Sequence, residues 1–368
     1  MKKLTGIVTL LFAFGLYGEY VQAQESPALF ASRANARIAK ASGLKNKWDG
    51  PTTGPKISAK QRRIVMITAD MRNPSLMALQ RGLREATTTA GWELIVMDTW
   101  SLPNKRGDAF SRAMALKPDG IILAGIDAKD QQKEINQANK ANIAIVGWHA
   151  SFKLGPTDGL FTNIGTDPKE VAQTAALFAA LEANGKAGVV VYTDSSSLYM
   201  VAKSNEIADT IKLCQSCSLL GMEEIPLISP NEKMSASVAS LMKVHGKKWT
   251  HTIVVNDLYL DAMTTPAVEN ALGDSKMQGI SAGDGSDSAY KRIRNKKFQV
   301  ATIPEPLQLH GWQLVDELNR SFSNEKPSMY STAAYIVTNQ NLVYHGGQAN
   351  SFDPDNGYRN EYKKIWGK

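Results

Sequence analysis

Polar and aromatic side chains recur directly after the short apolar runs of this sequence. The members of this set are Asp70, Asn73, Trp100, Trp148, His149, Asn256, Asp284 and Glu305. Their carboxylate, amide and imidazole groups donate or accept hydrogen bonds, and indole faces cover apolar C–H surfaces. A sugar or polyol needs that combination, because it presents hydroxyls and C–H faces together. The set therefore predicts a site for a small polar solute.

The acidic residues of the set are also compatible with an enzymatic function. Asp70, Asp284 and Glu305 could supply a carboxylate pair for glycoside hydrolysis, which needs two carboxyls at a defined separation. The sequence has no nucleophile-elbow motif, no phosphate-cradling glycine loop and no metal constellation. Carboxylates in a cleft can equally accept hydrogen bonds from hydroxyls or attract an amine. We predict a binding protein without catalytic residues, metal or cofactor, and keep glycoside processing as an alternative.

Alternating strand and helix segments must position these side chains. Short, mostly β-branched runs predict strands at residues 64–68, 93–98, 120–124, 143–147, 188–193, 218–225, 252–256 and 278–282. Helix-length segments occupy residues 76–91, 108–116, 131–141, 168–185, 203–212, 232–245, 259–272 and 286–295. This alternation predicts parallel sheets with helices on both faces and a site beyond the carboxyl ends of the strands. Eight such units exceed one small domain, so we expect two lobes.

The first residues indicate an export signal. Residues 2–3 are lysines, residues 7–16 are mainly apolar, and residues 21–23 place small side chains around a cleavage site after Ala23. The apolar run is shorter than the roughly 20 residues of a membrane-spanning helix. We therefore expect a cleaved signal peptide and a periplasmic protein. Residues 24–60 are polar and predict an N-terminal extension with a short surface helix.

The formal net charge of the chain is +7, of which the signal segment carries +1. The basic residues of the remaining chain are dispersed. Their densest clusters, at residues 243–248 and 291–297, fall at the ends of predicted helices. Such clusters are typical of a solvated surface, so we predict no nucleic-acid partner.

Cys214 and Cys217 are the two cysteines of the chain, and they form a C-x-x-C motif. In an oxidising compartment, this spacing favours a disulfide that staples the turn between a helix and the next strand. A redox-active pair and a metal site remain alternatives. A metal needs further ligands, and the five histidines are scattered without ligand spacing.

Six motifs, in order over residues 63–341, resemble the periplasmic ribose/galactose-type solute-binding proteins of ABC sugar transporters. They are RIVMITADMRNPSLMALQRGLREAT, KPDGIILAGIDAKD, ANIAIVGWHA, HTIVVNDLYLDAM, GISAGDGSDSAYKRI and FQVATIPEPLQLHGWQLVDEL. The resemblance implies two Rossmann-like lobes, joined by a three-stranded hinge, that close on a ligand. It implies an ABC permease as partner or, alternatively, a membrane receptor kinase that reads the bound form. We expect a monomer.

The resemblance also adds residues to the predicted site. Carried over residue by residue, it adds Ser75 and Lys203, the latter where the family has an arginine. At two places this sequence differs from the family's sugar-contacting residues, and these differences narrow the choice of ligand. The family's Asp-Arg pair after the fourth strand reads His149-Ala150 here, and its stacking aromatics read Ser75-Leu76. The implied ligand is a sugar, polyol or related polar solute, and the motifs do not point to ribose or an ordinary hexose.

The resemblance predicts where the chain passes between lobes, near residues 163–167, 303–306 and 334–338. It assigns residues 61–163 and 306–335 to the first lobe, and residues 164–305 and 336–368 to the second. The tail carries Tyr358, Tyr362 and Trp366 at four-residue spacing, which predicts a helix packed on a lobe.

For some of these residues, a role in packing, turn formation or helix capping is an alternative to ligand binding. The indoles of Trp100 and Trp148 suit core packing as well as a cleft. Asp284 lies between glycines and could hold its own turn. Asp127 and Asp257 are interpreted as caps of the helices that follow them, and we leave both out of the site.

Overall fold

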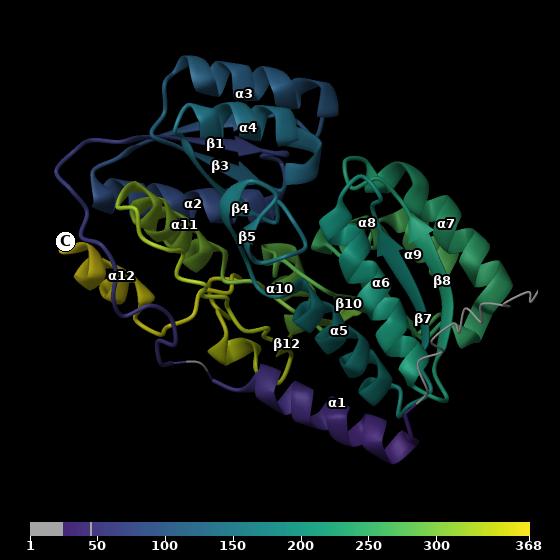
Figure 1. Ribbon diagram of the computed structural model, residues 1–368. Helices are drawn as coiled ribbons and strands as arrows, with labels where there is room; N and C mark the ends of the chain where they lie inside the picture. The colour runs from purple at the N-terminus through teal and green to yellow at the C-terminus, as the bar shows by residue number, and fades with distance from the viewer. Residues whose placement is uncertain (1–24, 45) are drawn as a thin grey trace, which may run out of the picture.

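The structure, a computed structural model, describes residues 25–44 and 46–368. Within these residues the strands form two six-stranded sheets, which are the centres of the two lobes in Figure 1. The strand orders are β2-β1-β3-β4-β6-β5 and β12-β11-β10-β9-β7-β8. The predicted fold class, two doubly wound and mostly parallel lobes, is confirmed. The predicted signal peptide, residues 1–23, lies outside the described residues.

The first lobe is a sheet buried on both faces. Its elements are β1 (Arg63–Thr68), α2 (Pro74–Ala90), β2 (Glu93–Asp98), α3 (Arg106–Ala115), β3 (Gly120–Ala124), α4 (Gln132–Lys140), β4 (Ala144–Trp148), β5 (Gly155–Thr157), β6 (Leu160–Ile164) and the returning α11 (Leu307–Phe322). Ile64 and Met66 of β1 join one hydrophobic cluster with α2 and α11, whereas Val65 and Ile67 join another with α3 and α4. Two-sided burial explains the continuous apolar runs of the parallel strands.

The second lobe repeats this design. Its elements are α5 (Pro168–Glu182), β7 (Gly188–Thr193), α6 (Leu198–Leu213), β8 (Ser218–Glu224), α7 (Pro230–His245), β9 (His251–Val254), α8 (Asp257–Met263), α9 (Pro266–Leu272), β10 (Gln278–Ser281), α10 (Asp287–Arg294), β11 (Gln299–Thr302) and β12 (Val337–Thr338). The prediction of one helix over residues 259–272 is wrong. Pro266 lacks an N–H and begins α9, so the segment forms two helices.

The predicted disulfide is confirmed. Cys214 and Cys217 are bonded and close the turn between α6 and β8, where the Cys217 amide also donates to the Cys214 carbonyl at 3.1 Å. Over residues 25–44 and 46–368, no helix combines the length and apolar character that a membrane crossing requires.

The N-terminal extension contacts both lobes. Helix α1 (Pro27–Ser42) begins after a Ser26 cap and packs Phe30 and Ala34 against the second lobe. The following segment lies on the first lobe, where the Thr53 carbonyl accepts a hydrogen bond of 2.6 Å from Nη2 of Arg320. The extension is therefore a strap between the lobes, which is more than the surface helix we predicted.

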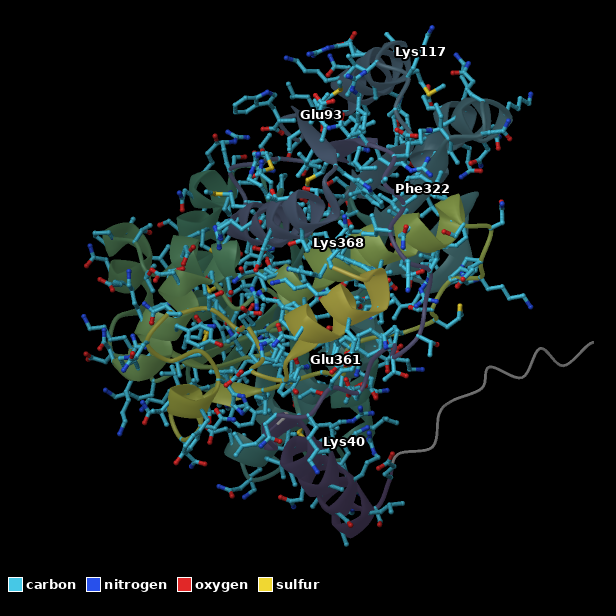
Figure 2. All side chains as sticks on the ribbon, turned by 90° about the vertical axis from the view of Figure 1, so that its left-hand side faces the viewer. Lys40, Glu93, Lys117, Phe322, Glu361 and Lys368 are labelled. Carbon is cyan, nitrogen blue, oxygen red and sulfur yellow. A yellow bond between two sulfur atoms is a disulfide. The ribbon has the colours of Figure 1, made fainter. Side chains whose placement is uncertain are left out.

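The C-terminal helix α12 (Tyr358–Trp366) packs on the first lobe, so the assignment of residues 336–368 to the second lobe is wrong for this helix. The Trp366 ring stacks on Trp312 of α11 with centroids 5.2 Å apart, and its Nε1 donates to Asp316 at 2.8 Å. Figure 2 faces this side and shows α12 lying against α11. The aromatic rings spaced four residues apart on α12 all pack on Trp312 of α11, and this packing returns the chain to the first lobe.

We expect Trp366→Ala to lower the free energy of unfolding by about 3–5 kcal/mol, because the change opens a cavity in a buried aromatic cluster. Denaturation in urea followed by circular dichroism measures this loss. Lys364→Ala, an exposed change on the same helix, should stay within about 0.5 kcal/mol of the unsubstituted protein. Equal stability of the two variants would contradict the docking of α12.

Candidate functional site

A cavity of about 530 Å³ lies between the two lobes. The segments that line it follow β1, β2, β3 and β4 in the first lobe and β7, β8, β9 and β10 in the second. The carboxyl ends of parallel strands meet at one edge of each sheet, and here these edges face each other. The cavity therefore lies where the strand-end argument predicts a site.

Most of the predicted site residues meet in this cavity. Those that line it are Asp70, Asn73, Ser75, Trp148, His149, Lys203, Asn256 and Asp284. The other two, Trp100 and Glu305, do not line it. Trp100 is 49% exposed, outside the cavity. Glu305 is 1% exposed and lies at the hinge.

The inner end of the cavity centres on Asp284, in the turn after β10. Asp284 has a left-handed backbone (φ 72°) and accepts a hydrogen bond from the Asn256 amide. Asn256 also caps α8 by accepting from the Leu258 amide at 3.0 Å. The prediction that Asp257 caps this helix is therefore wrong. The Asp257 carboxylate instead accepts from the Ser286 amide at 2.7 Å and holds the turn beside Asp284.

Lys203 of α6 is buried at the same end of the cavity. Its Nζ donates to the Val255 carbonyl at 3.0 Å and lies 5.2 Å from the centroid of the Tyr199 ring. Gly283 has a φ of 150°, which strains any residue with a Cβ, and a Cβ there would also come within 2.7 Å of Nζ. Burial lowers the pKa of Lys203, against the attraction of Asp284 and Glu305. Burial likewise raises the pKa of Asp284 to about 7.

Three rings form a stack that joins the lobes. His149 of the first lobe lies between Trp148, at 3.7 Å between centroids, and Tyr199 of the second lobe, at 4.0 Å. The ring planes are within 18° of parallel, so the faces are in contact. His149 holds a left-handed backbone (φ 50°), which turns its ring into this position. Strained backbone of this kind is characteristic of sites where function fixes a side chain.

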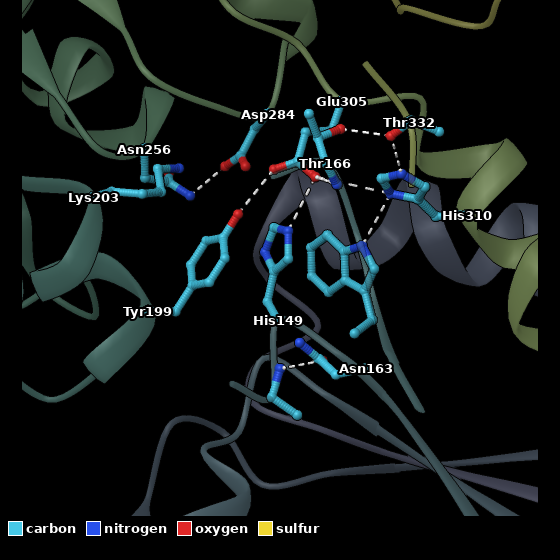
Figure 3. A network of polar contacts seen from close by, with 12 residues as sticks. His149, Asn163, Thr166, Tyr199, Lys203, Asn256, Asp284, Glu305, His310 and Thr332 are labelled. Atoms are coloured by element: carbon cyan, nitrogen blue, oxygen red, sulfur yellow. Dashed lines mark hydrogen bonds and ion pairs between the residues drawn. The ribbon is translucent and has the colours of Figure 1, made fainter. Parts of the chain in front are cut away.

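Glu305 holds this stack from the hinge (Figure 3). Its Oε2 lies 3.0 Å from Nε2 of His149, the Tyr199 hydroxyl donates to its Oε1 at 3.3 Å, and the Thr166 amide donates to Oε2 at 3.3 Å. Burial acts to raise the pKa of Glu305, but the hydrogen bond from His149 and the charges of His149, His310 and Lys203 together outweigh it and lower the pKa to about 2. Burial lowers the pKa of His149 against the attraction of Glu305, and its Nε2 donates to the carboxylate.

A second chain of hydrogen bonds connects the stack to the hinge crossings. Nε1 of Trp148 donates to Nδ1 of His310 at 3.1 Å, and Nε2 of His310 lies 2.8 Å from the Thr332 hydroxyl. The Thr332 hydroxyl in turn lies 2.6 Å from the hydroxyl of Thr166, in another crossing. Movement of one lobe must therefore rearrange a connected set of buried polar groups.

Asp127 bridges the lobes at another point. Its carboxylate accepts from the amide of Leu198, the first residue of α6 in the opposite lobe, at 2.9 Å. It makes no capping hydrogen bond to the short 3₁₀ turn that follows it, Ala128–Gln131. The prediction that it caps the next helix is wrong, because the free amides of α6 compete for the same carboxylate.

Several residues of the cavity wall were not predicted from the sequence, among them Tyr199 and Arg106. Tyr199 lies four residues before Lys203 and therefore shares its helix face, a spacing that could have revealed it. Arg106, the first residue of α3, also lines the cavity. No apolar run ends next to Arg106, so the strand-end rule gives no signal for it.

The raised pKa of Asp284 predicts a pH-dependent stability. The unfolded chain loses this proton near pH 3.8, whereas the folded protein keeps it until about pH 7. The folded state binds more protons across this window, so its stability falls as pH rises through it. We expect the melting temperature to fall relative to that of Asp284→Asn as the pH rises from about 4 to about 7. A constant difference between the two proteins would contradict the assignment.

Comparison with known proteins identifies the architecture. A profile described as "Periplasmic binding protein domain" matches residues 64–325, well over half of the chain. No curated protein matches the sequence.

Solved structures share the fold at low sequence identity. A sugar ABC transporter protein from Yersinia enterocolitica is 13% identical, with a TM-score of 0.71 over 86% of this chain and 99% of that chain. An ABC transporter solute-binding protein from Agrobacterium vitis, bound with alpha-D-tagatopyranose, is 14% identical, with a TM-score of 0.70 over 79% and 99%. A chain of the XylFII-LytSN complex is 15% identical, with a TM-score of 0.65 over 77% and 99%. The profile match, on a fold of two facing lobes, shows that this chain belongs to the periplasmic binding protein domain family.

Proposed function

We propose that the protein is the solute-binding component of an ABC-type importer and binds a small polyhydroxylated molecule between its lobes. The observation that carries this proposal is the convergence of polar and aromatic side chains from both sheets on one cavity. Similar structures include a sugar ABC transporter protein and a protein bound with a ketohexose, and both support the sugar class.

The inner end of the cavity suits hydroxyl groups. Asn73 uses its Oδ1 to accept from the Ser75 amide at 2.9 Å, which leaves its NH₂ group for a ligand. Lys203 makes one hydrogen bond from Nζ and has two further protons to donate. Asp284, with a pKa of about 7, both donates and accepts near neutral pH. Trp148 and Tyr199 add ring surface for C–H groups.

Binding is coupled to closure of the lobes. Asn73, Ser75 and His149 belong to the first lobe, whereas Lys203 and Asp284 belong to the second. A ligand that contacts both sets binds the closed arrangement better and shifts the population toward it. A membrane permease then recognises the closed shape. The carboxylates act as hydrogen-bonding groups in this proposal, and no catalytic step is assigned.

The family implies a periplasmic location. Export by a signal peptide cleaved after Ala23 and action as a monomer are parts of the proposal. A second candidate function is a sensor that presents its bound form to a membrane receptor. One observation favours it: a chain of similar fold comes from a complex of two proteins, XylFII-LytSN.

A thermal-shift screen of pentoses, hexoses and polyols tests the proposal, because a ligand at a hundredfold excess over Kd stabilises the folded protein by about 2.7 kcal/mol.

With the best compound, Asp284→Ala and Asn256→Ala should weaken binding about five- to 150-fold in calorimetric titration, since unpaired groups remain in a desolvated site. Trp100→Ala, outside the cavity, is the control and should bind normally. Absence of any sugar or polyol ligand, or unchanged affinity in both cavity variants, would refute the proposal.

A further inference from the structure

The cavity extends beyond the predicted ligand residues to a second, more exposed end. There it is lined by Arg72, Ser101 and Arg106 of the first lobe and by Leu227, Ile228 and Asn231 of the second. We call these residues the outer subsite. The inner end is buried, as Lys203 and Asp284 are 2% and 7% exposed, whereas Ile228 is 46% exposed.

The size of the cavity is not the result of widely separated lobes. The lobes are already joined by the hydrogen bond from the Leu198 amide to Asp127 and by the stack of His149 on Tyr199. With these contacts made, about 530 Å³ remains. This volume lies within the roughly 300–1,000 Å³ range of pockets that enclose drug-sized ligands, which are larger than one sugar ring.

Arg106 has hydrogen-bonding capacity that the protein leaves unused. Its side chain is 12% exposed, and Nη1 reaches Asp130, which is 54% exposed, at 3.4 Å. Its Nε is shielded from solvent and has no partner among the described residues. A guanidinium carries five N–H donors, and buried donors without partners are unfavourable. The Nη donors that Asp130 leaves unused would serve a ligand with acceptor oxygens at this end.

The charges around Arg106 favour a neutral ligand group. Asp127 and Asp130 lie beside Arg106, and Arg72 is paired with Asp70 through Nε at 2.9 Å and Nη2 at 2.5 Å. These carboxylates offset the guanidinium charges, so a further carboxylate would gain little. The apolar side chains of Leu227 and Ile228 complete the surface. Acceptor-rich and apolar faces occur together on a second sugar ring.

We infer that the outer subsite binds the second sugar unit of a neutral disaccharide or glycoside, and that Arg106 donates hydrogen bonds to it. The inference rests on the proposed function, since the first unit occupies the inner end. Arg106 is then the residue that makes the protein prefer a ligand larger than a monosaccharide.

Calorimetric titration with matched sugars tests the inference. The probes are glucose against cellobiose and maltose, galactose against melibiose, and galacturonate against digalacturonate. We expect a neutral disaccharide to bind at least about tenfold more tightly than its monosaccharide, and Arg106→Ala to remove roughly that tenfold gain while monosaccharide affinity stays unchanged.

Asp130→Asn is the matched control, because it removes the ion pair without altering the cavity wall. It should keep the preference for the disaccharide, and the unliganded melting temperatures show that both variants fold. Equal binding of monosaccharide and disaccharide, or equal loss of both in Arg106→Ala, would overturn the outer subsite and leave the sugar-binding function standing. A preference for digalacturonate would overturn its neutral character. Absence of binding by every probe and by the screened polyols would refute the proposed function itself.

Discussion

The buried carboxylate of Glu305 is the group on which the arrangement of the two lobes depends. An ionised carboxylate away from water is costly unless donors surround it. Its donors come from three places: His149 in the first lobe, Tyr199 in the second and Thr166 in a crossing between them. The lobe arrangement in which Glu305 receives these hydrogen bonds also brings the strand ends together around the cavity.

The chain termini add connections between the lobes. The N-terminal extension packs its helix on the second lobe and its following segment on the first. The C-terminal segment leaves the second lobe after β12 and returns to the first lobe as α12, stacked on α11. Both helices lie outside residues 64–325, the region that the family profile matches. They strengthen the connection between the lobes while the cavity keeps an exposed end at Ile228.

Much of the fold could be predicted from the sequence because its parallel strands are buried on both faces. The runs that became β1, β3 and β7 have continuous burial and therefore continuous hydrophobicity. The position of the cavity followed from the same runs, since polar residues after parallel strands gather at one edge. Strand β5, three residues long and paired antiparallel, has too little pattern to be predicted.

The remaining differences between prediction and structure concern contacts between distant segments. Glu305 was predicted to contact the ligand, but partners separated from it by more than one hundred residues occupy its oxygens. The sequence shows that residues 358–366 form an aromatic helix face, yet only packing against Trp312 decides which lobe receives it. Pro266 differs from these cases, because its effect on the predicted helix was readable from local rules.

We propose that a ligand draws the two lobes together around the hinge carboxylate of Glu305. Small-angle X-ray scattering of the protein with and without a saturating ligand tests it most directly. We expect the radius of gyration to fall on binding, and the bound profile to agree with the one calculated from this structure. Identical profiles for the free and bound protein would contradict closure.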